Sequence, residues 1–81
     1  MKLYLLSQND NTGYDTYDSC VVCAENEEDA KTITPYGNVY SEPVKIYSDW
    51  ALSKENILCE EIGKANDKQV RGVILASFNA G

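Results

Sequence analysis

The chain begins with a short segment in which hydrophobic residues occupy both sets of alternating positions. Within residues 2–7, Leu3 and Leu5 fall on one face of an extended chain, and Tyr4 and Leu6 fall on the other. Successive side chains of a β-strand point to opposite faces, so this period of two indicates a strand. Neither face is plainly polar, and we expect a strand with no fully solvated side.

Three further segments have the composition of strands. Residues 17–24 contain an uninterrupted apolar run at 20–24, and residues 70–78 contain another at 73–76. Such a run places apolar side chains on both faces, which is typical of a strand covered on two sides, so 17–24 is expected at the centre of the sheet. Residues 57–62 predict a strand at or near a sheet edge, because two adjacent glutamates discourage unwanted pairing there.

One short helix is expected between residues 24 and 57. Asn26 has the side chain of a helix N-cap, and three acidic residues follow it, where the helix dipole favours negative charge. We expect the helix to run from 27 to about 32 and to end before the Thr-Pro-Tyr-Gly sequence at 34–37. Residues 38–56 show no clear period and are interpreted as an irregular insertion over the sheet.

These elements predict an α+β fold, a small and mainly antiparallel β-sheet with one short helix on one face. The 81 residues are interpreted as a single domain, 1–81, because no repeat or boundary interrupts them. A domain of this size has a small core, and burial between subunits would add to it. We therefore expect a homo-oligomer, a dimer or larger, that forms through the other face of the sheet.

The charge of the chain restricts its expected partners. The net charge is −6, and the seven basic residues are scattered along the sequence. Binding a phosphate backbone requires clustered cations, so we expect no nucleic acid polymer as a partner. No apolar run approaches the roughly 20 residues of a membrane helix, and no signal-peptide core is visible, so we expect a cytoplasmic protein with no membrane partner.

Catalytic and metal chemistry are not expected. The chain has no histidine, which removes the most common general base and metal ligand. Cys20 and Cys23 have C-x-x-C spacing, but residues three apart in a strand point to opposite faces, so their thiols cannot share a metal ion. We interpret both, together with Cys59, as reduced and packed thiols. The Asn-rich loop from residue 8 lacks the first ligand and the bidentate glutamate of an EF-hand, so no calcium and no other cofactor is expected.

One short cluster has the composition of a ligand-binding site. Aromatic, carboxylate and hydroxyl side chains stand together where the polar loop meets the second strand: Tyr14, Asp15, Thr16, Tyr17, Asp18 and Ser19. Tyrosine offers a flat face for stacking, and acidic or hydroxyl neighbours can orient a sugar or a base edge. Trp50 as a further stacking ring, Arg71 as a phosphate-binding guanidinium, and Ser77 and Asn79 near the end of the chain complete the candidate set.

A structural interpretation of the same residues stands beside this one. The tyrosines can pack at the margin of the sheet while the aspartates and the serine cap a turn. Tyr36, Tyr40 and Tyr47 lie in or beside the irregular segment and are candidates for the same margin. Arg71 can equally be a solvated residue beside a turn.

Several segments of the chain resemble a widespread family of very short phage and prophage proteins. The resemblance rests on residues 1–8 (MKLYLLSQ), 13–19 (GYDTYDS), 21–28 (VVCAENEE) and 72–81 (GVILASFNAG), and it is weak in the middle of the chain. Small acidic phage proteins include anti-defence factors. Some of these, such as the Sequestin-like sponges, bind the cyclic nucleotide signals of bacterial immunity as homo-oligomers.

The resemblance implies a non-enzymatic, phage-encoded anti-defence protein that acts in the cytoplasm of the host cell. It would sequester a small nucleotide immune signal of the cyclic ADP-ribose type without cleaving it. The aromatic rings would stack on adenine, the carboxylates with Ser19 and Asn79 would bind ribose hydroxyls, and Arg71 with backbone amides would hold phosphate. Two alternatives stay open: an acidic inhibitor that binds a host defence enzyme, and a phage accessory protein with another role.

Overall fold

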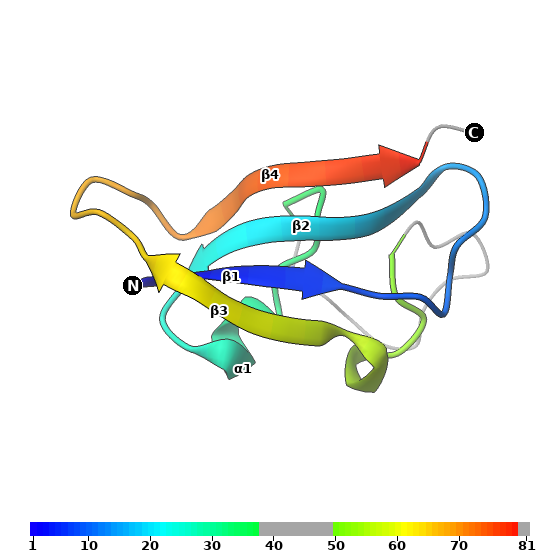
Figure 1. Ribbon diagram of the computed structural model, residues 1–81, viewed down its shortest axis with the longest axis horizontal. Helices are drawn as coiled ribbons and strands as arrows, with labels where there is room; N and C mark the ends of the chain where they lie inside the picture. Colours follow the sequence, from blue (N-terminus) through cyan, green and yellow to red (C-terminus); the bar gives the residue numbers. More distant parts are fainter. Residues whose placement is uncertain (38–49, 80–81) are drawn as a thin grey trace.

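The protein is built around one antiparallel β-sheet (Figure 1). The computed structural model describes residues 1–37 and 50–79. Within them the elements are β1 (Lys2–Ser7), β2 (Thr16–Ala24), α1 (Glu27–Ala30), the 3-10 turn η1 (Lys54–Asn56), β3 (Leu58–Lys64) and β4 (Gly72–Asn79). The four strands lie in the order β3-β1-β2-β4, so β1 and β2 form the centre and β3 and β4 the edges. The predicted sheet with one short helix is confirmed.

The helix is shorter than the sequence predicts. Asn26 is its N-cap as expected, and its side chain accepts a hydrogen bond from the backbone amide of Asp29. After Ala30 the chain tightens into bonds between residues three apart, from the amide of Thr32 to the carbonyl of Asp29 and from Ile33 to Ala30. The hydroxyl of Thr32 donates to the same Asp29 carbonyl at 2.6 Å. This competition for the helix carbonyls ends α1 at Ala30 rather than at residue 32.

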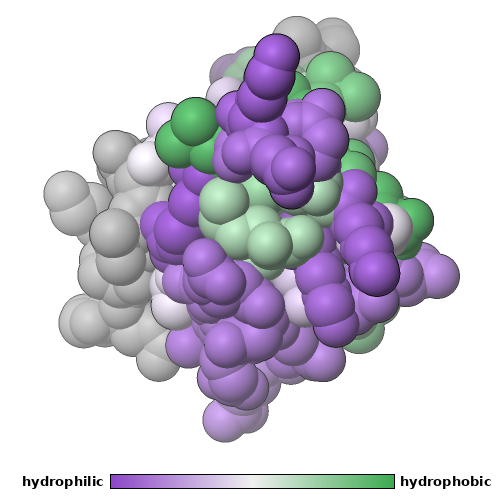
Figure 2. Space-filling model, turned by 90° about the vertical axis from the view of Figure 1, so that its left-hand side faces the viewer, coloured by the Kyte–Doolittle hydropathy of each residue, from purple (hydrophilic) through white to green (hydrophobic). Residues whose placement is uncertain are grey.

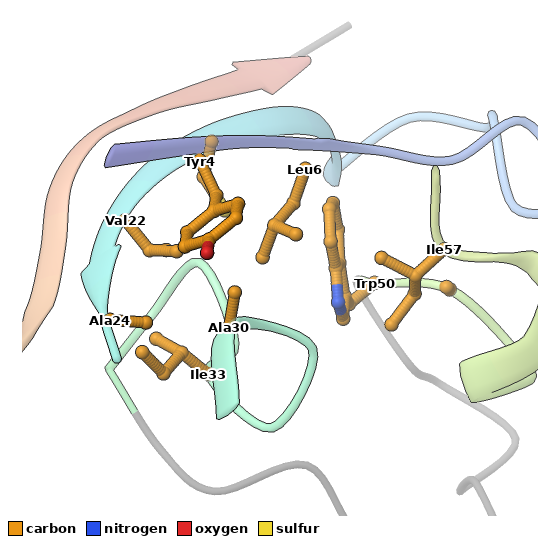
Figure 3. Packing of buried hydrophobic residues seen from close by; sticks show 10 residues of the cluster. Tyr4, Leu6, Val22, Ala24, Ala30, Ile33, Trp50 and Ile57 are labelled. Carbon is orange, nitrogen blue, oxygen red and sulfur yellow. The ribbon is translucent and has the colours of Figure 1, made fainter. Parts of the chain in front are cut away.

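The core lies on one face of the sheet (Figure 3). Tyr4 and Leu6 point from β1 toward α1 on one side and toward Trp50 on the other, as the alternation in the sequence predicts. The buried cluster consists of Tyr4, Leu6, Cys20, Val22, Ala24, Ala30, Ile33, Trp50, Ala51 and Ile57. Residues 50–57 therefore supply the part of the core that α1 is too short to cover, which confirms that this end of the irregular segment folds over the sheet.

The opposite face of the sheet, here called the open face, presents Leu3, Leu5, Ser19, Val21, Leu58, Leu75 and Ser77. This face is turned to the viewer in Figure 1, and α1 lies behind the sheet. The apolar run at 73–76 was expected to be covered on both sides, but Leu75 is 69% exposed and Ile74 44% exposed. Within the described residues, β4 is an edge strand whose apolar side chains meet solvent.

The connection between β3 and β4 lies at the end of the molecule shown in Figure 2. Most of this end is hydrophilic, and the strongly hydrophobic residues lie toward its margins. The connection at 65–71 is mostly exposed, and within it the amide of Gln69 donates a hydrogen bond to the carbonyl of Asn66. The apolar surface of the protein belongs to the sheet rather than to this end.

The one-sided core generates a prediction for Leu6, which is fully buried. Replacing Leu6 with Ala should lower the free energy of unfolding by about 3 kcal/mol, through lost burial and the cavity left behind. Denaturant unfolding followed by the fluorescence of Trp50, the one tryptophan of the chain, measures this change.

The matched control is Leu58→Ala, at a leucine that is 63% exposed on β3. It should change the free energy of unfolding by no more than about 0.5 kcal/mol. Equal losses for the two variants would contradict the assignment of the core to one face.

Candidate functional site

The loop between β1 and β2 is held by a glutamine that the sequence did not single out. Gln8 is only 5% exposed, and its side-chain amide donates to the carbonyls of Asn11 at 2.8 Å and Tyr17 at 2.7 Å. Its Oε1 accepts from the amides of Asp10 and Asn11. Four hydrogen bonds to the backbone make this loop a built structure rather than a flexible connection. The available clue was a polar residue directly after a strand and before an Asn- and Asp-rich turn.

A tight turn at Asp15 joins this loop to the end of β4. Asp15 has a φ of 60°, in the left-handed region that aspartate tolerates better than most residues. In this conformation its amide donates to the carbonyl of Asn79 at 2.6 Å. The hydroxyl of Thr16 and the side-chain amide of Asn79 both donate to the carbonyl of Gly13. The sequence-predicted residues at 13–19 and Asn79 are therefore neighbours in space.

The two tyrosines of the cluster have different surroundings. Tyr17 packs edge-to-face on Phe78, with ring centroids 4.7 Å apart, and its centroid lies 6.1 Å from that of Tyr36. Tyr14, by contrast, is 79% exposed. The packing interpretation thus holds for Tyr17, and Tyr14 is the ring available to an incoming ligand. Tyr40 and Tyr47 lie outside the described residues.

Beside this cluster the open face has a depression of about 360 Å³. Its apolar lining includes Leu5, Val21 and Leu75, and Ser19 and Ser77 add hydroxyls. The two serines are register partners on β2 and β4, so they lie side by side across the strands. The hydroxyl of Ser19 donates to the carboxylate of Asp18 at 3.2 Å, which connects the depression to the acidic part of the cluster.

Trp50 does not belong to this surface. Its side chain is 1% exposed and packs with Leu6 and Ile57 in the core (Figure 3). Its carbonyl accepts a hydrogen bond from the side chain of Asn11 at 2.8 Å, so the polar loop itself fixes this segment under the sheet. The expectation that Trp50 stacks on a ligand is replaced by a core role, because a buried ring offers no free face.

Arg71 lies at the other end of β4, where it forms an ion pair with Asp29. Its guanidinium bonds both carboxylate oxygens of Asp29 at 2.8 to 3.0 Å and also the hydroxyl of Thr32. Arg71 precedes the first residue of β4 whereas Asn79 is its last, so the strand separates the two by about 23 Å. The expected joint site of Arg71 with the tyrosine cluster is therefore corrected: Arg71 anchors the start of β4 to Asp29 of α1 and to Thr32 beyond it.

The cysteines are placed as the sequence predicts. The register puts Cys20 beside Leu6 on the core face and Cys23 beside Leu3 on the other face. Both are buried thiols without a disulfide, and burial raises the pKa of Cys20 to about 12. Cys20 therefore stays protonated at neutral pH and acts as a small hydrophobic side chain.

Eight of the ten candidate residues are thus brought to one end of the sheet, as a continuous set from Tyr14 to Ser19 with Ser77 and Asn79. They combine an exposed ring, two carboxylates, hydroxyls and an adjacent apolar depression. Such a set can hold a flat molecule that carries hydroxyl groups. Within residues 1–37 and 50–79, no group of three carboxylate or thiol side chains is placed to hold a metal ion.

No protein-family model, curated protein or solved structure matches this chain. The helices within the described residues are all too short or too polar to cross a membrane.

The ion pair at Arg71 predicts a specific pH dependence of stability. Hydrogen bonds from the Arg71 guanidinium hold the pKa of the Asp29 carboxyl below its ordinary value, and a hydrogen bond from the backbone amide of Glu25 contributes less to the same effect. A lowered pKa in the folded state stabilises the protein above the unfolded pKa of about 4, and this stabilisation is lost as the pH falls through the folded value. Because both groups are partly exposed, we expect a contribution below about 1 kcal/mol.

Unfolding of Asp29→Asn and of the unsubstituted chain between pH 3 and 7 checks this dependence. The difference in unfolding free energy should be largest near neutral pH and should shrink below about pH 4. Glu28→Gln, at the neighbouring exposed position of α1, is the control for removing one negative charge. A difference that is constant over this range would contradict the role assigned to the pair.

Proposed function

We propose that this chain is a non-catalytic binding protein that sequesters a small nucleotide signal of the cyclic ADP-ribose type. The observation that carries the proposal is the position of the apolar depression directly beside the hydroxyls of Ser19 and Ser77 and the carboxylate of Asp18. A nucleoside has a flat apolar ring attached to a sugar with several hydroxyls. These two halves match the two kinds of surface that adjoin here.

Each half of the ligand has a defined contact in this proposal. The base lies against Leu5, Val21 and Leu75, or stacks on the exposed ring of Tyr14 at the margin. The ribose hydroxyls donate to the carboxylates of Asp15 and Asp18 and exchange hydrogen bonds with the serines. Binding alone requires no general base and no metal ion, in agreement with a sequence that has no histidine.

The phosphate groups are the part of the ligand that this site contacts least. Arg71, the one arginine of the chain, is occupied by Asp29 at the far end of β4. Asp15 and Asp18 repel a phosphate, so it has to point away from them, toward backbone amides and hydroxyls. Affinity is therefore expected to come mainly from the base and the sugar.

The biological setting of the proposal comes from the resemblance to short phage proteins. We propose that the protein is encoded by a phage, acts in the cytoplasm of the host and withholds the signal from an immune effector. Self-association belongs to the same proposal, since the open face of one chain leaves the depression open to solvent. A second subunit would give it a further wall.

Titration calorimetry with cyclic ADP-ribose and with adenosine tests the binding proposal. We expect both to release heat. We also expect affinity for the cyclic nucleotide to change little with salt, because the candidate site as described includes no cluster of lysine or arginine side chains. Tyr14→Ala, or Ser19→Ala with Ser77→Ala, should weaken binding by about tenfold, which corresponds to one or two lost contacts.

The control for these variants is Leu58→Ala, on the same open face but at the opposite edge strand. It should bind like the unsubstituted chain. Absence of heat with every nucleotide and nucleoside tried, at protein concentrations that keep any oligomer intact, would overturn the proposal.

A second candidate function is an acidic inhibitor that binds a host defence enzyme. It is favoured by one observation, the coexistence of exposed leucines on the open face with a net charge of −6. Exposed apolar patches rimmed by polar residues are common at protein interfaces, and acidic charge steers a basic partner.

Purification of the tagged protein from host lysate separates the two functions. Sequestration predicts a co-purifying small molecule that absorbs ultraviolet light, whereas inhibition predicts a stoichiometric protein partner. A protein partner that is lost on Leu75→Lys would favour the inhibitor, because Leu75 is the most exposed leucine of the open face at 69%.

A further inference from the structure

The two edges of the sheet differ in how they are protected from pairing with another strand. On β3, Glu60, Glu61 and Lys64 are charged, and Glu61 forms an ion pair with Lys2 at 3.1 Å. Register shifts, as found at β-bulges, occur in the pairings of both edge strands, so irregularity does not distinguish them. Charge on an edge strand is a usual means of avoiding another sheet, and it is charge that distinguishes β3 from β4.

The edge at β4 has no comparable charge. Its eight residues, GVILASFN, include no charged residue and no proline, and among the described strands β4 pairs with β2 alone. Three of its large apolar side chains are exposed: Ile74 at 44%, Leu75 at 69% and Phe78 at 46%. After the register shift near Ile74, the pairing with β2 is regular from Leu75 to Ser77.

We propose that β4 of a second copy of this chain pairs antiparallel with β4, about a two-fold axis near its middle. Two identical strands can always be paired in this way, because an antiparallel pair of equal sequences is self-complementary. The two sheets then join into one continuous sheet, and the open faces of both copies lie on the same side. In this arrangement Leu75 of each copy approaches the other across the new strand pair.

Charge favours the β4 edge over the open face as the contact between two copies of the chain. Two chains of net charge −6 repel each other, and the uncharged β4 edge lets them meet without placing carboxylates opposite one another. The open face is less suitable, because Glu60 is the register partner of Leu5 and projects from it. Stacking two open faces would bring both copies of this carboxylate into the contact.

The pairing also accounts for the apolar run at 73–76. Such a run is typical of a strand with neighbours and cover on both sides, yet among the described strands of one chain only β2 lies beside β4. With the partner's β4 in place it becomes an interior strand. The depression at Leu75 and Ser77 then has a wall on the side where one chain leaves it open. This inference goes beyond the proposed function, because it requires no ligand.

Sedimentation over a range of concentrations, with two matched leucine variants, tests the proposal. Leu75 on β4 and Leu58 on β3 are both on the open face and similarly exposed, at 69% and 63%. We expect the unsubstituted chain and Leu58→Lys to dimerise and Leu75→Lys to be monomeric, because two lysines would meet at the axis. The fluorescence of the buried Trp50 verifies that each variant is folded.

Amide hydrogen exchange of the unsubstituted chain supplies a readout that needs no variant. Amides of β4 should exchange more slowly at high than at low protein concentration, whereas amides of β3 should not change. The proposal is overturned by a chain that is monomeric at all concentrations, by equal loss of the dimer in both variants, or by protection confined to β3. A strictly monomeric chain would also remove the self-association part of the proposed function, whereas nucleotide binding itself is measured separately by calorimetry.

Discussion

The structure of residues 1–37 and 50–79 depends on a buried core that covers one face of a four-stranded sheet. Tyr4, Leu6 and Val22 project from the two central strands, and α1 with residues 50–57 closes over them. On the opposite face, Leu58 and Leu75 are exposed within the described residues. Within residues 1–37 and 50–79, one face of the sheet is therefore dry and the other is partly apolar and exposed. The proposed nucleotide site lies on the exposed face, whereas the proposed dimer contact lies along the edge at β4.

The strands and the start of the helix can be predicted from the sequence because they depend on residues close together in the chain. The alternation from Leu3 to Leu6 predicts the two faces of β1 correctly. Asn26 and the three acidic residues after it predict the start of α1. The end of α1 is less readable, since it depends on which carbonyl Thr32 bonds. The exposure of Leu75 is not readable at all, because strand order is decided by pairings between distant segments.

Part of the candidate site is predictable from residues close together in the sequence, and part depends on contacts between distant residues. Residues 14–19 are contiguous, and their pairing with Ser77 and Asn79 follows from two neighbouring strands. The roles of Trp50 and Arg71 depend on contacts with Asn11 and Asp29, which are 39 and 42 positions away in the sequence. Composition makes both residues candidates for ligand binding, because it does not show whether a rare aromatic ring or a lone guanidinium lies on the surface or packs within the fold.

The connection from Lys64 to Gly72 joins strands at opposite edges of the sheet. Its seven intervening residues must span three strand spacings, about 14 Å, which an extended chain of that length reaches easily. Among the described strands, β1 and β2 are the one hydrogen-bonded pair that is consecutive in the sequence, and each edge strand pairs with one strand of this hairpin. Folding should begin at this hairpin and proceed slowly for so small a chain, because the remaining pairings close long loops.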